Sequence, residues 1–224
     1  MSYNAIIRNT ANNISGISYN GNGGLHYNTI STNISAGGGD TYAFRLSDGL
    51  PSLNYNNIFN NTTTFHLYNY GVSGSTVNAE NNWWGTSNQS EIEDKIYHFL
   101  DDASKGTVDY IPFDTAIRTD CPISPPAGLI STGWNSIQWS PNPEADVAGY
   151  IVYWDTDSGF PYEHSVNVGN VTSYTVPGFS YEYVTVTAYD SDYSPANDDP
   201  DTIVNDNMTN GNESWFAVEL EVGL

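Results

Sequence analysis

The stretches Tyr3-Asn4-Ala5-Ile6, Tyr27-Asn28-Thr29-Ile30 and Tyr55-Asn56-Asn57-Ile58 repeat one pattern at steps of 24 and 28 residues. In each copy a further Asn follows three residues after the isoleucine, and a degenerate fourth copy starts at Val77 and leads into Asn81-Asn82. A repeat length in the twenties suits one turn of a β-solenoid and is too short for a helical-hairpin repeat. The repeats therefore predict a solenoid in the first half of the chain.

Strand-like alternation supports this prediction. Leu25-His26-Tyr27, Phe44-Arg45-Leu46 and Phe65-His66-Leu67 each place apolar residues on both sides of a polar one. Such alternation is typical of a strand with one buried face. Clusters rich in glycine, at residues 20–24 and 36–40, offer the positive backbone angles of tight corners, so we expect the chain to turn there.

A capping helix is expected near residues 90–104, after the last repeat. Residues 91–100 place Ile92, Ile96, Phe99 and Leu100 on one helical face. Ser90 is the expected N-cap and Lys105-Gly106 the expected stop. A returning strand is expected over residues 108–111.

The Asn-x-Ile-x-x-Asn repeats, ending in Asn81-Asn82-Trp83-Trp84-Gly85-Thr86, resemble the right-handed parallel β-helix repeat proteins of secreted bacterial and archaeal polypeptides. The resemblance covers about residues 1–117, and it implies an all-β domain over residues 1–119 with core positions for Trp83 and Trp84. It also implies an extracellular or cell-surface location. The repeats begin at Tyr3 without a cap, which suggests either a fragment of a longer polypeptide or a first coil that docks on a neighbouring subunit.

A Pro-rich linker is expected over residues 120–126, because its prolines oppose both helix and strand ladder. Residues 127–224 resemble a fibronectin type III module, an immunoglobulin-like β-sandwich of short alternating strands. A long Asp- and Asn-rich loop over residues 191–213 departs from that pattern. The resemblance is carried by runs at residues 125–129, 136–139 (with Trp139), 147–154, 173–176, 181–190 and 215–220.

Charge narrows the range of partners. The 26 acidic residues face five basic ones, giving a formal net charge of −21, and every basic residue precedes Cys121. Such a surface repels nucleic acid and anionic membranes, so neither is an expected partner.

Cys121, the single cysteine, is expected to be either a small buried hydrophobe or a free thiol.

A polar ladder of His26, Arg45 and His66 is the first candidate site, since these residues occupy the middle of matching strand patterns. Neighbouring coils would stack them about 4.8 Å apart on the outer face. Parallel β-helix polysaccharide lyases work on such a face, but this chain has no lysine before Lys95. An ordinary solvated face explains the same residues.

Calcium and sugars are the other candidate ligands. Calcium prefers six to eight oxygen ligands, although the acidic residues do not follow the spacing of a twelve-residue calcium loop, and an acidic loop without metal is the alternative. Sugars would stack on exposed aromatic rings, for which Trp154 and Trp215 are the candidates, whereas aromatic enrichment more often reflects a core. The candidate calcium ligands are Asp190, Asp192, Asp198, Asp199, Asp201 and Asp206.

Taken together, the sequence predicts a non-catalytic structural or adhesive module that contacts polysaccharide or a cell-surface glycan. One alternative is the C-terminal fragment of a carbohydrate-active enzyme, a lyase or glycosidase whose other coils hold the groove. A second alternative is a self-assembling surface filament, in which an apolar end face from Tyr3 to Ile17 is covered by another chain.

Overall fold

A computed structural model describes residues 4–71, 73–157, 161–177 and 183–190, together with the backbone of 213–214 and 220–221. The chain divides into two compact units, Met1–Pro122 and Ile123–Leu224.

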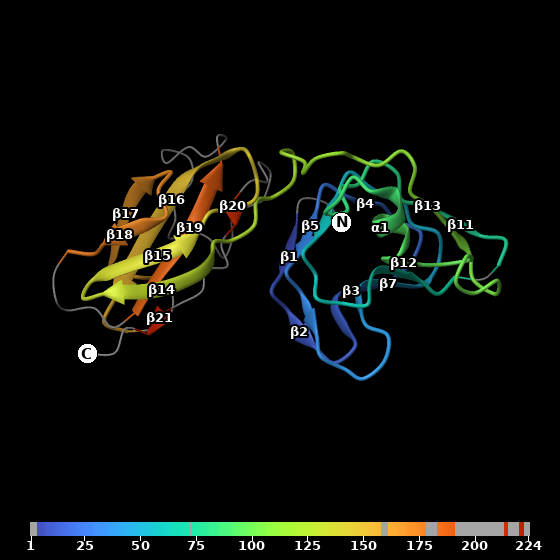
Figure 1. Cartoon of the computed structure of the whole chain (residues 1–224), viewed down its shortest axis with the longest axis horizontal. Coiled ribbons are helices and arrows are strands. Elements are labelled where there is room, and N and C mark those ends of the chain that lie inside the picture. Colours follow the sequence, from blue (N-terminus) through green and yellow to red (C-terminus); the bar gives the residue numbers. More distant parts are fainter. Residues whose placement is uncertain are drawn as a thin grey trace. The chain divides into compact units, whose positions relative to one another are not determined.

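The first unit is a β-solenoid of about four turns, consistent with a parallel β-helix (Figure 1). Its strands pair with parallel partners from neighbouring turns, in the sheet orders β1-β5-β9 and β12-β10-β7-β3 and the pairs β2-β6, β4-β8 and β11-β13. The strands are β1 (Ala5–Ile7), β2 (Thr10–Ala11), β3 (Ile14–Asn20), β4 (Leu25–His26), β5 (Thr29–Ser31), β6 (Ile34–Ser35), β7 (Tyr42–Asp48), β8 (Leu53–Asn54), β9 (Asn57–Phe59), β10 (Phe65–Asn69), β11 (Thr76–Asn78), β12 (Ile96–Tyr97) and β13 (Thr107–Asp109).

Apolar side chains from equivalent positions of successive turns stack on one another in the interior of the solenoid. Ile6 lies next to Ile30, and Ile30 next to Ile58, in the register of β1, β5 and β9. Ile30 and Ile58 are buried, and Trp84 belongs to the same hydrophobic cluster. Trp83, in contrast, is only half-buried and lies outside this cluster, so the core position expected for it is wrong.

Two ladders of asparagine amides run along the solenoid. In the first, each Oδ1 accepts hydrogen bonds from the backbone N–H and the side-chain amide of the Asn in the preceding turn, at 2.8–3.1 Å. Because Asn28, Asn56 and Asn82 are buried, each of their bonds satisfies a polar group that would otherwise cost free energy. The ladders are Asn4-Asn28-Asn56-Asn82 and Asn9-Asn33-Asn61.

Non-glycine residues make the corners that precede these ladders. Tyr27, Tyr55 and Asn81 have φ of 56°, 59° and 57°, and each directly precedes an Asn of the first ladder. The second ladder has the same arrangement. Glycine clusters therefore supply only part of the left-handed geometry that the sequence suggested. The left-handed residues of the second ladder are Arg8, Thr32 and Asn60, at φ of 52–55°.

The helix after the last repeat is much shorter than predicted. Helix α1 spans Gln89–Glu93, and its N-cap is Asn88, whose side chain accepts from the Ser90 N–H, rather than Ser90 itself. Ile96 and Tyr97 then form β12 and pair with β10, so a helix to about residue 104 is wrong. Pairing with β10 buries Ile96 in the solenoid. A short helix draws most of its stability from such packing, so the burial favours the strand.

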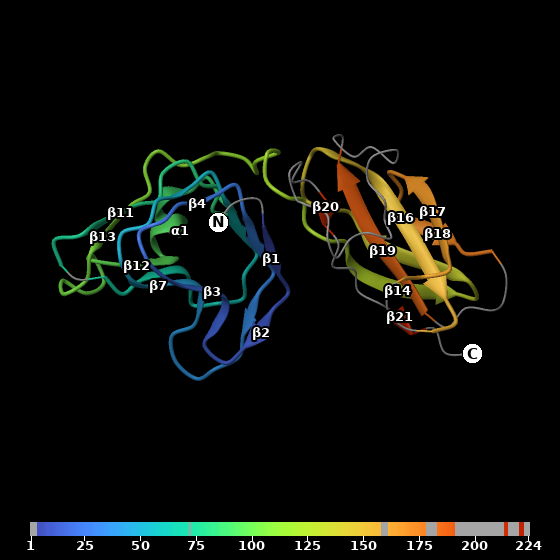
Figure 2. The ribbon, with the colours of Figure 1, turned by 180° about the vertical axis from the view of Figure 1, so that it is seen from behind.

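The second unit consists of two antiparallel sheets (Figure 2). The two sheets share one hydrophobic cluster, which includes Trp139, Tyr150 and Val186. Five of the predicted runs overlap observed strands, while β17 was not predicted; the five are 125–129, 136–139, 147–154, 173–176 and 181–190. Tyr181 and most of the predicted last strand lie outside the described residues. The sheets are β14-β15-β18 and β17-β16-β19-β20, with β21 on β19; the strands are β14 (Ala127–Gly133), β15 (Ser136–Ser140), β16 (Val147–Asp155), β17 (His164–Gly169), β18 (Ser173–Thr175), β19 (Tyr183–Asp190), β20 (Glu213–Ser214) and β21 (Leu220–Glu221).

Candidate functional site

The three residues of the predicted polar ladder do not come together. His26 lies on β4, which pairs with β8 in a sheet that contains neither β7 nor β10. Arg45 on β7 lies opposite Tyr68, not His66, because β10 is shifted by two residues from the alignment that the sequence suggested. The apolar flanks of the three patterns look alike, but their registers differ, and a register shift changes every neighbour.

His66 is buried rather than exposed. Only 7% of the residue is accessible, and its Nδ1 has no hydrogen-bond partner among the described residues. Burial, reinforced by the positive charge of Lys95, lowers the pKa of His66 to about 4. The imidazole is therefore neutral at pH 7 and is part of the packing of the solenoid.

We predict that His66 makes the solenoid sensitive to acid. The unfolded chain binds a proton on this side chain below its ordinary pKa of about 6.5, while the folded chain does so only near 4. Stability is therefore fully present above about pH 6.5 and falls as the pH drops toward about 4, by up to about 3 kcal/mol. In His66→Leu, the difference between unfolding free energies at pH 7 and pH 4, from urea titrations, should shrink by that amount. An unchanged difference would contradict the assignment.

The metal and sugar candidates from the sequence fall mostly outside the described residues. Asp190 is buried at the end of β19, whereas Asp192, Asp198, Asp199, Asp201, Asp206 and Trp215 are not among the described residues. Trp154 is half-buried against the core of the second unit and stacks on His164 at 5.5 Å. Within the described ranges, no group of three His, Cys, Asp or Glu residues could hold a metal ion, and no helix is long and apolar enough to cross a membrane.

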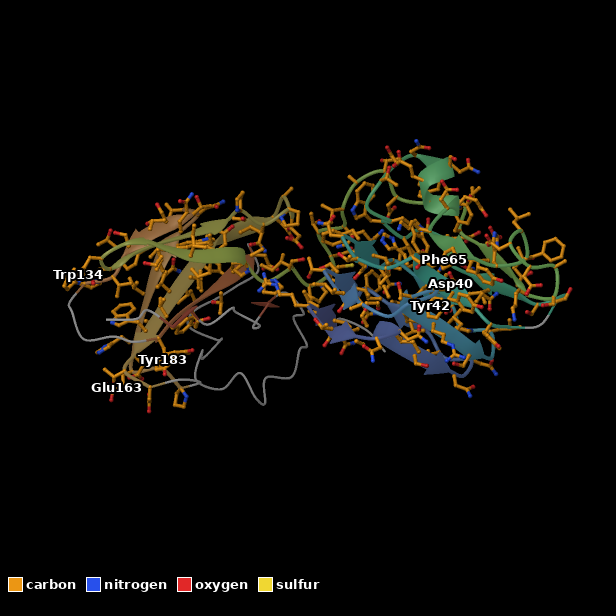
Figure 3. The ribbon with its side chains drawn as sticks, turned by 60° about the horizontal axis from the view of Figure 1, so that its bottom comes forward. Asp40, Tyr42, Phe65, Trp134, Glu163 and Tyr183 are labelled. Atoms are coloured by element: carbon orange, nitrogen blue, oxygen red, sulfur yellow. The ribbon has the colours of Figure 1, made fainter. Side chains whose placement is uncertain are left out.

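A cluster of aromatic rings on sheet β12-β10-β7-β3 is the most distinctive surface feature of the solenoid. We call it the aromatic row: Tyr42, Phe65, Tyr68 and Tyr97. Tyr68 lies 4.2 Å from Tyr42 and 4.4 Å from Tyr97 between ring centroids, the latter pair nearly parallel. Phe65 meets the edge of Tyr97 at 5.2 Å. Figure 3 shows Tyr42 and Phe65 close together.

The aromatic row lies outside the hydrophobic interior. None of its members belongs to the buried cluster of the solenoid, and Tyr42, Phe65 and Tyr97 are each half-exposed. Burial of the hydroxyls raises the pKa of Tyr42, and of Tyr68 more strongly, so these hydroxyls stay protonated and can donate. The row therefore presents ring edges and hydroxyl groups from three adjacent strands.

Tyr70 lies beside the aromatic row, and two basic side chains pack over its ring. The Lys105 ammonium lies 4.0 Å and the Arg45 guanidinium 5.1 Å from the centroid of its ring. Tyr70 is 47% exposed and lies 5.8 Å from Tyr68. Cation–π contacts of this kind hold the basic side chains at this end of the aromatic row.

A network of polar side chains stabilises the last turn of the solenoid. Like the aromatic row, it was not predicted from the sequence. Glu93 accepts from His98 Nε2 and from the Tyr110 hydroxyl, each at 2.7 Å, while His98 Nδ1 accepts from the Val108 N–H at 3.0 Å. Burial and Glu93 raise the pKa of Tyr110 to about 12. These bonds connect α1 to β13, so we assign the network a structural role.

Cys121 is buried. Its thiol donates to the Tyr55 carbonyl oxygen at 3.2 Å, and burial together with Asp120 raises its pKa to about 12. A thiol in this state is a poor nucleophile.

No protein-family model matches the sequence, and no curated protein or solved structure matches it. The geometry of the aromatic row is therefore the basis on which a function can be assigned. The row was missed at the sequence level because its members come from separate strands, and only the inter-turn register brings them together.

Proposed function

We propose that the chain is a non-catalytic extracellular module with a structural or adhesive role, and that it contacts surface carbohydrate through the aromatic row. In this proposal the first unit is a right-handed parallel β-helix and the second a fibronectin type III-like β-sandwich. The edge-to-face contact of Trp139 with Tyr150, on strands of different sheets, supports the second assignment.

The observation that carries the proposal is the aromatic row itself. Tyrosine combines an apolar ring with a polar tip, so it suits interfaces that are partly wet. Glycans offer apolar C–H faces and many hydroxyls, which match ring edges and phenol groups on a rigid surface. Because ring packing between Tyr42, Tyr68 and Tyr97 restricts these side chains before binding, little rotamer entropy remains to be lost.

The enzyme alternative has no comparable support. His26 lies on a different sheet from Arg45, and His66 is buried with a neutral imidazole. A general base must reach its substrate, which His66 does not do in this structure. No feature of the described residues favours a lyase over a binding module.

A glycan array tests the proposal, with the full chain and the double variant Tyr42→Phe/Tyr97→Phe, which keeps the rings and removes two hydroxyls. We expect the wild type to bind at least one class of glycan without cleaving it, and the variant to bind about tenfold or more weakly. Trp134→Ala is the matched control, because Trp134 is 78% exposed on the second unit. Equal losses in both variants, or new reducing ends, would contradict the proposal.

A further inference from the structure

Tyr68 and Tyr97 are direct partners on neighbouring turns of the solenoid. Strands β10 and β12 run parallel, and their register places Tyr68 opposite Tyr97. The two rings are nearly parallel, with an interplanar angle of 8° and centroids 4.4 Å apart. Neighbouring strands of a sheet are also about 4.8 Å apart, so the backbone pairing holds the two rings against each other. Carbon atoms of the two rings are therefore in van der Waals contact, at about 4 Å.

This pair of rings is accessible from solvent. Tyr68 is 8% exposed, whereas Tyr97 and Tyr42, on the strands to either side of it, are half-exposed. The Tyr42 ring lies 4.2 Å from Tyr68 and is tilted from it by 47°. An oxidant in solution therefore reaches the outer rings, and the ring contacts allow Tyr68 to pass an electron to an oxidised neighbour.

A second stacked pair of tyrosines, Tyr27 and Tyr55, lies elsewhere on the solenoid and differs in two ways. Its ring centroids are farther apart, at 5.4 Å, although the rings are again nearly parallel. The Arg118 guanidinium also lies 5.0 Å from the Tyr55 centroid and 5.9 Å from that of Tyr27. A positive charge at this distance disfavours the loss of an electron from either ring. Oxidation chemistry between two rings is therefore favoured at Tyr68 and Tyr97.

We propose that Tyr68 and Tyr97 form a site of oxidative cross-linking, at which a haem peroxidase acting with hydrogen peroxide couples the two rings into dityrosine. Each phenol loses one electron and one proton. The two phenoxyl radicals then form a carbon–carbon bond between the ring positions next to their hydroxyls. The hydrogen on each of these carbons leaves as a proton, and each oxygen takes up a proton. Hydrogen peroxide accepts the two electrons and two protons and becomes two molecules of water.

The cross-link ties β10 to β12 and closes the segment that contains β11 and α1. The new bond is about 1.5 Å long, so the rings must approach and turn, for which the half-exposed Tyr97 has room. A covalent link between distant residues restricts the unfolded chain and so stabilises the folded one. Sulfur supplies no such link within this chain, because Cys121 is the single cysteine. The inference is independent of glycan binding.

Peroxidase treatment of the full chain at low protein concentration tests the proposal. We expect a monomer lighter by two hydrogens, with dityrosine fluorescence, and a proteolytic fragment that joins Tyr68 to Tyr97. Tyr97→Phe keeps the ring and removes the phenol, so it should lower the yield of this intramolecular product about tenfold or more. Tyr55→Phe is the matched control, because it removes a phenol from the other stacked pair, and it should leave the yield unchanged.

Urea unfolding provides a second readout. The cross-linked wild type should unfold at a higher urea concentration than the untreated chain, whereas treated and untreated Tyr97→Phe should unfold alike. Circular dichroism before treatment checks that both variants fold. A monomer without dityrosine, a cross-link that joins any other pair of tyrosines, or equal losses of yield in the two variants would overturn the proposal.

Discussion

Asn56→Ala should destabilise the solenoid by about 4 kcal/mol, an effect far above the usual cost of a surface substitution. The Asn56 amide is fully buried, and its Oδ1 accepts from the Asn28 N–H at 2.9 Å and from the Asn28 amide at 2.8 Å. Its Nδ2 donates to the carbonyl oxygens of Leu25 and Asn54 and to Asn82 Oδ1, each at 2.9 Å. The substitution leaves all of these buried groups without that partner.

Urea unfolding followed by circular dichroism measures this effect. Asn13→Ala is the control, because Asn13 is exposed and outside both ladders, and we expect a change of about 0.5 kcal/mol or less. If Asn56→Ala were as stable as Asn13→Ala, the ladder would not hold the turns together as described.

Trp84→Ala should also cost about 4 kcal/mol, in this case through lost packing. Trp84 is 2% exposed and belongs to the hydrophobic cluster that contains Ile58 and Ile92. Its removal leaves a cavity at the end of the solenoid interior, and the surrounding side chains can close only part of it. The free energy of unfolding from urea titration is again the quantity to measure.

The neighbouring tryptophan provides a control of identical chemistry. Trp83 is half-buried, and its backbone N–H donates to the Asn56 carbonyl oxygen at 2.9 Å. Trp83→Ala keeps that bond and should cost less than half as much as Trp84→Ala. Similar costs for the two substitutions would show that burial does not distinguish them.

The repeat pattern predicted the solenoid because each copy carries its own ladder asparagine and its own core isoleucine. The match is weaker at the fourth turn, where the degenerate copy starts at Val77 and the ladder passes through Asn82. The left-handed corners at Tyr27 and Tyr55 could not be predicted from glycine, because neither residue is one. The ladder bonds of the asparagine that follows each tyrosine compensate for the strained backbone.

The candidate site was harder to predict than the fold. Arg45 and His66 occupy the centre of similar patterns, yet Arg45 lies opposite Tyr68. The turns differ in length, as the ladder separations of 24, 28 and 26 residues show, so similar patterns need not align. A surface built from several turns, such as the aromatic row, depends on that alignment and therefore becomes visible only in three dimensions.

Hydroxyl-radical footprinting of the full chain, with and without the tightest-binding glycan from the array, tests the central claim most directly. Oxidation of tyrosine rings is read out residue by residue by mass spectrometry. The account predicts that the glycan protects Tyr42 and Tyr97 and leaves the exposed Trp134 unchanged. Unchanged oxidation of Tyr42 and Tyr97 with a bound glycan, or protection confined to residues after Pro122, would contradict it.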